Sequence, residues 1–239
     1  HFGGGMKKSS GFTMAEVLIT LGIIGVVAAI TLPALIEKVD FYVRKQQFKK
    51  VYNTLSSALA RTFADNGGYY SECYYDYGSA DPFTNGSECA ELVYSLKNRL
   101  NILKVCNNNA LEGGCISSEM KGTDTILKES DSDLDDEDIL LQTGGCAGFR
   151  EANIKNRNAA WVLSDGTIIG FYGSTLKLFF VDINGLKRPN KWGYDIFGFS
   201  LVGDGKYVKI DPSKNQPTCT PVEEGGYSAK EMMDLIYRE

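Results

Sequence analysis

The stretch GFTMAEVLITLGIIGVVAAITLPALI, residues 11–36, decides how this chain is organised. Its last twenty residues, from Val17 to Ile36, carry no charged side chain. An apolar helix of roughly 20 residues is long enough to cross the hydrocarbon core of a bilayer. Glu16 stands at the start of this run, where a carboxylate drawn to mid-membrane costs roughly 2.5 kcal/mol or more. A carboxylate in such a place indicates a functional residue, and a cation is its expected partner.

The residues around Glu16 form a specific combination. Two lysines, Lys7 and Lys8, are followed by the sequence Ser9-Ser10-Gly11-Phe12-Thr13-Met14-Ala15-Glu16. This stretch closely resembles the cleavage and N-methylation motif of the type IV pilin and type II secretion pseudopilin superfamily. The remainder of the chain resembles that family only in layout.

The resemblance implies a processing site and an assembly residue. A prepilin peptidase would cut after Gly11 and methylate the amino group of Phe12. Glu16, the fifth residue of the mature chain, would pair with the Phe12 ammonium of a neighbouring subunit and set the axial register. A buried pair of this kind is better evidence for specificity than for net stability. Pro33 stands where many family members kink or loosen the helix, because proline lacks the backbone N–H of an intrahelical bond.

Two simpler interpretations of residues 11–36 stay open. A secretory signal has a basic region, a short apolar core and a cut site of small residues, for which Val27-Ala28-Ala29 qualifies. A plain signal anchor accounts for the length of the apolar run. Neither explains the order of two lysines, a Gly-Phe pair and a glutamate, so we prefer the pilin-like interpretation.

The charges before the apolar run predict its orientation. Lys7 and Lys8 place the N-terminus in the cytoplasm by the positive-inside rule. We therefore expect a single-pass protein of a bacterial inner membrane, with the part after Ile36 in the periplasm or, after assembly, on the cell surface. The expected partners are identical or homologous pilin subunits, a prepilin peptidase and the inner-membrane assembly machinery. The net charge of −5 argues against a nucleic-acid partner.

Periodicity predicts an α+β fold in which a long N-terminal helix packs on a C-terminal antiparallel sheet, and the resemblance implies that this layout is pilin-like. One helix is expected from about residue 13 to about residue 64, since neither glycine nor proline interrupts residues 34–66. Its second half carries an apolar stripe of Phe48, Val51, Leu55, Leu59 and Phe63. A short helix is expected at residues 87–102, strands at 161–163, 168–172, 176–181, 197–202 and 207–210, and a final helix at 229–238.

These elements divide the chain into six segments. Residues 1–5 precede Met6, the plausible initiator, and are interpreted as a non-native or read-through leader. The other segments are residues 6–11 as leader peptide, 12–36 as transmembrane and filament-core helix, 37–66 as its amphipathic continuation, 67–160 as a variable disulfide-containing region and 161–239 as the sheet region.

Six cysteines follow the apolar run, which indicates an oxidising compartment. Six cysteines allow 15 pairings, and the sequence does not choose among them. We favour the neighbours in sequence, Cys73 with Cys89 and Cys106 with Cys115, and reduced cysteines remain an alternative. The disulfide candidates are Cys73, Cys89, Cys106, Cys115, Cys146 and Cys219.

A Ca²⁺ site is the one cofactor that the sequence suggests. The loop from Asp182 to Phe197 is similar to a loop of many pilin-like proteins, and some pseudopilins bind calcium in the corresponding region. Asp182, Asn184 and Asp195 offer the hard oxygen ligands that Ca²⁺ prefers. The alternative is that these side chains cap turns, with Gly185 and Gly193 at positive φ. The acidic run at residues 131–138 departs from an EF-hand and is expected to be a solvated loop.

The sequence does not suggest an enzyme. Its single histidine lies in the excluded leader, and nucleophilic catalysis by serine or cysteine needs a base. We expect a structural subunit of a pilus or of a secretion pseudopilus. The alternative is a minor pilin that displays its tyrosine-rich region, residues 69–77, as an adhesin or a DNA-uptake contact. A membrane-anchored periplasmic enzyme is a third interpretation.

Overall fold

The computed structural model describes residues 11–65, 73–83, 89–173, 175–203, 207–214 and 219–237. The chain divides into two compact units between Val43 and Arg44. Of the expected leader, residues 6–11, only Gly11 is described; the first five residues, Tyr69 and Tyr70 also lie outside the described residues.

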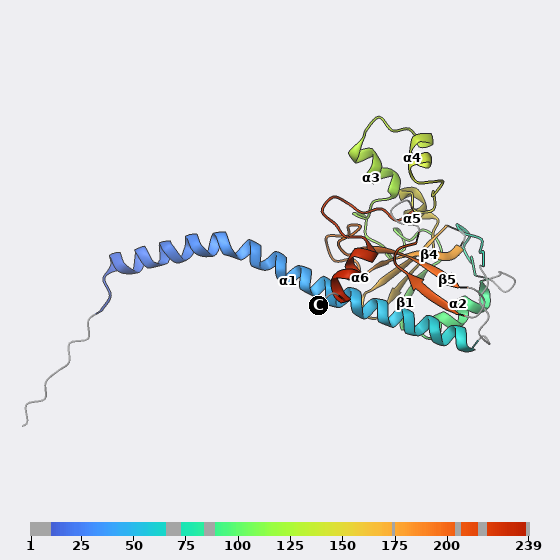
Figure 1. Cartoon of the computed structure of the whole chain (residues 1–239), viewed down its shortest axis with the longest axis horizontal. Coiled ribbons are helices and arrows are strands. Elements are labelled where there is room, and N and C mark those ends of the chain that lie inside the picture. Colours follow the sequence, from blue (N-terminus) through green and yellow to red (C-terminus); the bar gives the residue numbers. More distant parts are fainter. Residues whose placement is uncertain are drawn as a thin grey trace, which may run out of the picture. The chain divides into compact units, whose positions relative to one another are not determined.

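Helix α1 spans Met14–Asp65 and belongs to both units, which confirms the long helix predicted from periodicity (Figure 1). It continues through Pro33, and the predicted kink there stays a prediction. In the first unit the side chains of the apolar run are mostly exposed. From Arg44 onward α1 buries one stripe, because its apolar residues recur every three or four positions. The stripe comprises Phe48, Val51, Leu55, Leu59 and Phe63.

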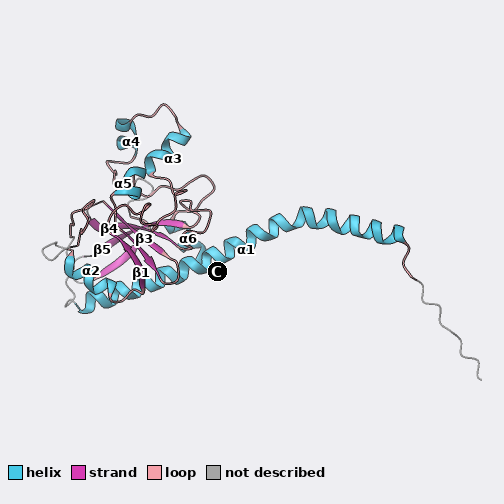
Figure 2. Cartoon of the chain, turned by 180° about the vertical axis from the view of Figure 1, so that it is seen from behind, coloured by secondary structure: helices cyan, strands magenta, loops and turns pink. Residues whose placement is uncertain are grey.

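The second unit contains one six-stranded antiparallel sheet whose spatial order, β1 to β6, follows the chain. Figure 2 shows the strands together. The strands are β1 (Ile102–Cys106), β2 (Ala160–Leu163), β3 (Ile168–Tyr172), β4 (Thr175–Asp182), β5 (Ile196–Gly203) and β6 (Val208–Asp211). Five of them lie close to their predicted positions. The hairpin of β2 and β3 turns at Asp165 and Gly166, where Gly166 has φ +91°, a value that favours glycine.

The two faces of the sheet carry separate apolar layers, because successive side chains of a strand alternate between faces. On one face Phe48 of α1 contacts Phe197 and Phe199 of β5, with ring centroids 4.8 and 5.7 Å apart. The other face carries a core that includes Phe180 of β4 and Ile196 of β5, together with Phe149. The sheet is therefore buried on both sides.

The remaining helices are α2 (Ala90–Lys97), α3 (Thr123–Ser130), α4 (Asp136–Gln142), α5 (Glu151–Asn156) and α6 (Ala229–Tyr237). Helix α6 matches the predicted final helix. The helix expected at residues 87–102 was wrong at its C-terminal end, because the chain turns after Lys97 and Ile102 begins β1. This extra strand lies within the segment 67–160, outside the predicted sheet region.

The acidic run at residues 131–138 is only partly the loop that was expected. Helix α4 begins within it, at Asp136. The Asp135 side chain accepts hydrogen bonds from the backbone N–H groups of Glu137 and Asp138, both at 2.8 Å. Acidic residues suit this place, because a helix N-terminus presents unpaired N–H donors and a positive dipole end.

The structure joins all six cysteines in disulfides. Cys73 pairs with Cys89 and Cys106 with Cys115, which are the two pairings favoured from the sequence. The third bond joins Cys146 to Cys219 across a sequence separation of 73 residues. It ties the region of α4 and α5 to the segment that follows β6.

Candidate functional site

The start of α1 organises the residues of the N-terminal motif. The Thr13 backbone N–H and hydroxyl both donate to Oε2 of Glu16, each at 2.8 Å. In return the Glu16 N–H donates to the Thr13 hydroxyl oxygen at 3.3 Å. This reciprocal pair is a capping box, which satisfies backbone donors at a helix N-terminus.

The capping box leaves one oxygen of Glu16 available. Both bonds from Thr13 end on Oε2, and Oε1 has no hydrogen bond from any residue that the structure describes. The Thr-x-x-Glu spacing is a sequence signature of this device. This spacing therefore predicts the capping role of Thr13, a residue that was not among those singled out from the sequence.

The expected cleavage site is open in the described chain. Phe12 is 87% exposed, and Gly11 is exposed beside it. A Cβ atom placed on Gly11 would meet no atom within 4 Å. Packing within the described chain therefore does not require glycine at position 11.

The loop between β4 and β5 holds the three candidate calcium ligands. Oδ1 of Asp182 accepts hydrogen bonds from the N–H groups of Asn184 and Gly185, at 3.2 and 2.8 Å. Asp195 accepts from the N–H of Asn190 through Oδ2 and from that of Lys191 through Oδ1, at 2.8 and 2.7 Å. These hydrogen bonds are the ones expected if the two aspartates cap turns rather than bind Ca²⁺.

The two glycines of this loop have the predicted backbone conformation. Gly185 and Gly193 have φ values of +70° and +85°. A Cβ on Gly185 would lie 2.1 Å from the carbonyl oxygen of Gly166, so the turn needs glycine for space as well as for conformation.

Burial sets the electrostatics of the two aspartates. Asp182 is 3% exposed and Asp195 is fully buried. Burial, followed by repulsion from Asp195, raises the pKa of Asp182 well above its usual range. Burial also raises the pKa of Asp195, against its hydrogen bonds from backbone N–H groups.

The fit of these residues to Ca²⁺ is incomplete. Calcium takes 6–8 oxygen ligands. Both oxygens of Asp195 already accept backbone bonds, which leaves Oδ2 of Asp182 and Oδ1 of Asn184 without a hydrogen bond in the described part of the chain. Within that part no group of three or more His, Cys, Asp or Glu residues could hold a metal ion. Backbone carbonyls would have to supply most of a calcium shell.

The comparisons with known proteins concern the N-terminal stretch. Residues 6–32 match the family model described as the prokaryotic N-terminal methylation motif. The chain fits the type IV pilin and pseudopilin superfamily. Neither the curated proteins nor the solved structures gave a significant match to the chain.

The matched motif and the apolar run that follows it together support a membrane-anchored subunit of the prepilin type. Among the described residues, α1 is the one helix long and apolar enough to cross a membrane. Its N-terminal region carries both the motif and the apolar run. The matched motif supports a prepilin-type subunit, of a type IV pilus or of a pseudopilus.

The tyrosine-rich region of the subunit does not gather into one exposed surface among its described residues. Tyr74 is 56% exposed, whereas Tyr75 is buried against Phe83, with ring centroids 4.7 Å apart. The guanidinium of Arg157 stacks on Tyr77 at 4.3 Å from the ring centroid. Packing therefore accounts for two of these three tyrosines.

Proposed function

We propose that the subunit is cut after Gly11, methylated on Phe12 and assembled into a filament through its N-terminal helix. The observation that carries the proposal is the Thr13–Glu16 capping box within a matched methylation motif. Cleavage would create an ammonium group at Phe12, one residue before Thr13. Oε1 of Glu16 could then accept the Phe12 ammonium of a neighbouring subunit.

The exposed apolar surface of the first unit supports the same route. Before assembly the run from Val17 to Ile36 lies in the inner membrane, with the N-terminus in the cytoplasm and the second unit in the periplasm. During assembly the surface that faced lipid comes to face other subunits. The apolar side chains therefore stay out of water throughout assembly. The pairing of Glu16 with the Phe12 ammonium of a neighbour would select the axial register of the subunits.

The first experiment measures the N-terminal mass of membrane-extracted protein, expressed with and without a prepilin peptidase. We expect a mature chain that begins at methylated Phe12 only when the peptidase is present. A chain still beginning at Met6 with the peptidase would indicate a plain anchored domain. A chain cut near Ala29 would indicate a secreted one.

The second experiment tests the role of Glu16 with the substitution Glu16→Ala. We expect normal membrane insertion and cleavage but far fewer filaments, because the Phe12 ammonium loses its partner. Glu37→Ala is the matched control, since it removes the same charge from an exposed position of α1. Normal filament numbers with Glu16→Ala would count against the assembly role.

Calcium binding at the β4–β5 loop is a second proposal. It is favoured by the two buried carboxylates of Asp182 and Asp195, whose mutual repulsion a divalent cation would offset. The test is calorimetric titration of the detergent-solubilised subunit with Ca²⁺. Equal heats for the native chain and for Asp182→Asn would refute the site.

A further inference from the structure

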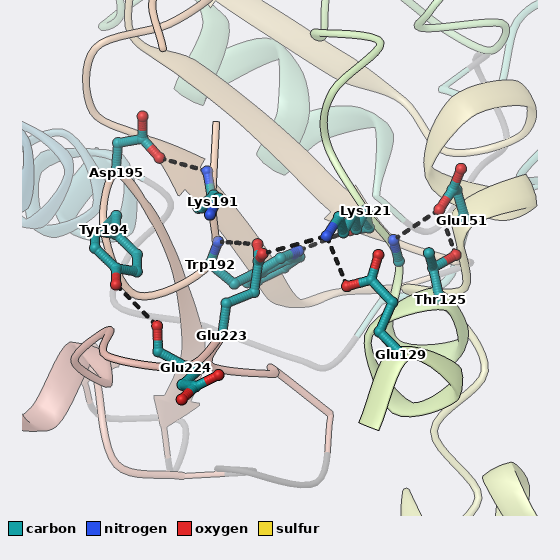
Figure 3. A network of polar contacts seen from close by, with 11 residues as sticks. Lys121, Thr125, Glu129, Glu151, Lys191, Trp192, Tyr194, Asp195, Glu223 and Glu224 are labelled. Carbon is teal, nitrogen blue, oxygen red and sulfur yellow. Dashed lines mark hydrogen bonds and ion pairs between the residues drawn. The ribbon is translucent and has the colours of Figure 1, made fainter. Parts of the chain in front are cut away.

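A cleft on the second unit lies apart from the N-terminal motif and from the β4–β5 aspartates. It has a volume of about 500 Å³ and is lined by α3, by Lys121 and Lys191, and by the segment Val222–Glu224. Pockets of about 300–1,000 Å³ are typical of ligand sites. Figure 3 shows Glu129, Glu223 and Trp192 around Lys121.

The cleft is built on the sheet face opposite α1. Trp192, which is fully buried in the core of that face, fixes two of its walls. The indole Nε1 donates to the carbonyl oxygen of Lys121 at 2.8 Å, and the Trp192 N–H donates to Oε1 of Glu223 at 3.0 Å. Glu223 is only 9% exposed. These bonds hold a lysine and a buried carboxylate at set positions before any ligand arrives.

The charges in the cleft favour a cation. Nζ of Lys121 lies 2.6 Å from Oε2 of Glu129 and 3.8 Å from Oε2 of Glu223, so two carboxylates already neutralise it. The hydrogen bond from Lys121 to Glu129 raises the pKa of this lysine, which keeps it protonated. Nζ of Lys191 lies over the Tyr194 ring, 5.9 Å from its centroid.

A third carboxylate, that of Glu224, completes the lining. It makes no ion pair with any residue in the described part of the chain, although the Glu224 carbonyl oxygen accepts a hydrogen bond from the Tyr194 hydroxyl. Three carboxylates therefore face two ammonium groups.

The uncharged residues of the cleft indicate which kind of molecule would bring the positive charge. Ile126, Leu127 and Val222 line the same cleft. Apolar side chains of this kind pack well against the methylene groups of a lysine or arginine side chain, whose charged head reaches the polar groups. A bare metal ion would not use this surface.

We propose that the cleft binds a lysine or arginine side chain from an extended segment of a partner protein. Its methylene groups would pack on Ile126, Leu127 and Val222, and its cationic head would lie among Glu129, Glu223 and Glu224. Within the second unit the cleft lies on the sheet face opposite Phe48, so a bound side chain would not compete with the packing of α1 on the sheet. The proposal does not rest on the proposed function.

The test uses the full-length chain in non-ionic detergent and titrates acetyl-tri-lysine amide at low salt by calorimetry. We expect saturable binding that weakens about tenfold in the double variant Glu129→Gln, Glu224→Gln. Both glutamates are outside the core, so the fold is expected to persist. The matched control is Asp133→Asn with Glu137→Gln, which removes two charges from the neighbouring acidic run and should change the affinity less than twofold.

Four results would overturn the proposal. They are the absence of saturable binding, equal weakening in the two double variants, binding of tri-glutamate as tight as that of tri-lysine, and binding of the free diamine cadaverine as tight as that of the peptide. The measurement needs neither cleavage nor assembly. Its failure is therefore distinguishable from failure of the filament proposal, which the N-terminal mass reports.

Discussion

The contact between α1 and the sheet depends on Phe48, and its truncation gives a strong quantitative prediction. Phe48 is 1% exposed and contacts Phe197 edge-on. A buried aromatic side chain removes about 150–250 Å² from water, which is worth about 4 kcal/mol at the low end of that range, and Phe→Ala in a core costs about 3–5 kcal/mol. We expect Phe48→Ala to lower the free energy of unfolding of the second unit by about 4 kcal/mol.

The assay is urea unfolding of the full chain in non-ionic detergent, followed by tryptophan fluorescence. Trp161 and Trp192 are both fully buried in the second unit, so their emission reports its unfolding. With a slope of about 2 kcal/mol per molar urea, the midpoint should fall by about 2 M. Lys49→Ala, one residue away and exposed, is the control and should change stability by less than about 0.5 kcal/mol. A midpoint shift for Phe48→Ala below about 0.5 M, with an unchanged slope, would refute the packing argument.

Two further predictions concern the disulfides and the buried aspartates. Replacing Cys146 and Cys219 by alanine should lower the free energy of unfolding by about 4 kcal/mol, and replacing Cys106 and Cys115 should lower it by about 2.6 kcal/mol. The reason is that loop-closure entropy grows with the sequence separation, which is 73 residues for the first pair and 9 for the second. Urea midpoints that rank the two variants in the opposite order would contradict this. Asp182→Asn should keep both backbone bonds to Oδ1 and remove a buried charge. Since the folded-state pKa of Asp182 is raised, the protonated carboxyl favours the folded state at low pH, and this contribution is lost as pH rises from about 4 upward. The Asp182→Asn variant should therefore be at least as stable as the native chain at about pH 7. Its advantage should disappear below about pH 4. Asp195→Asn, which gives up one of two accepted backbone bonds, should instead destabilise at pH 7, and the reverse ranking in urea titrations would contradict the assignment.

The sequence was informative wherever a repeating pattern decided the structure. The helical spacing of Phe48, Val51 and Leu55 predicted the buried stripe of α1, and an Asp-Gly turn predicted the β2–β3 hairpin. Strand β1 was missed because its five residues follow a leucine spacing that favoured a longer helix. Helix α4 was missed because a run of acidic residues is typical of a solvated loop. Only the capping of the helix N-terminus by Asp135 shows that the same residues can form a first helical turn.

The site residues were predictable to very different degrees. Gly11, Phe12 and Glu16 belong to one contiguous motif, so the sequence alone brought them together. The cleft could not be predicted, because Glu223 comes from a segment far along the chain from Lys121 and Glu129. No spacing rule connects Lys121 with Glu223, 102 positions away, when buried Trp192 is what links them.

The order of the strands bears on how the second unit folds. Each strand of the sheet pairs with strands adjacent to it in the sequence, so no strand has to insert between two that are already paired. The sheet can therefore grow in one direction along the chain, beginning with β1 and ending with β6. Cys219 lies beyond the last strand, so its bond to Cys146 can close only after the residues of all six strands have been synthesised. Oxidation at this pair would thus report a late stage in the folding of the second unit.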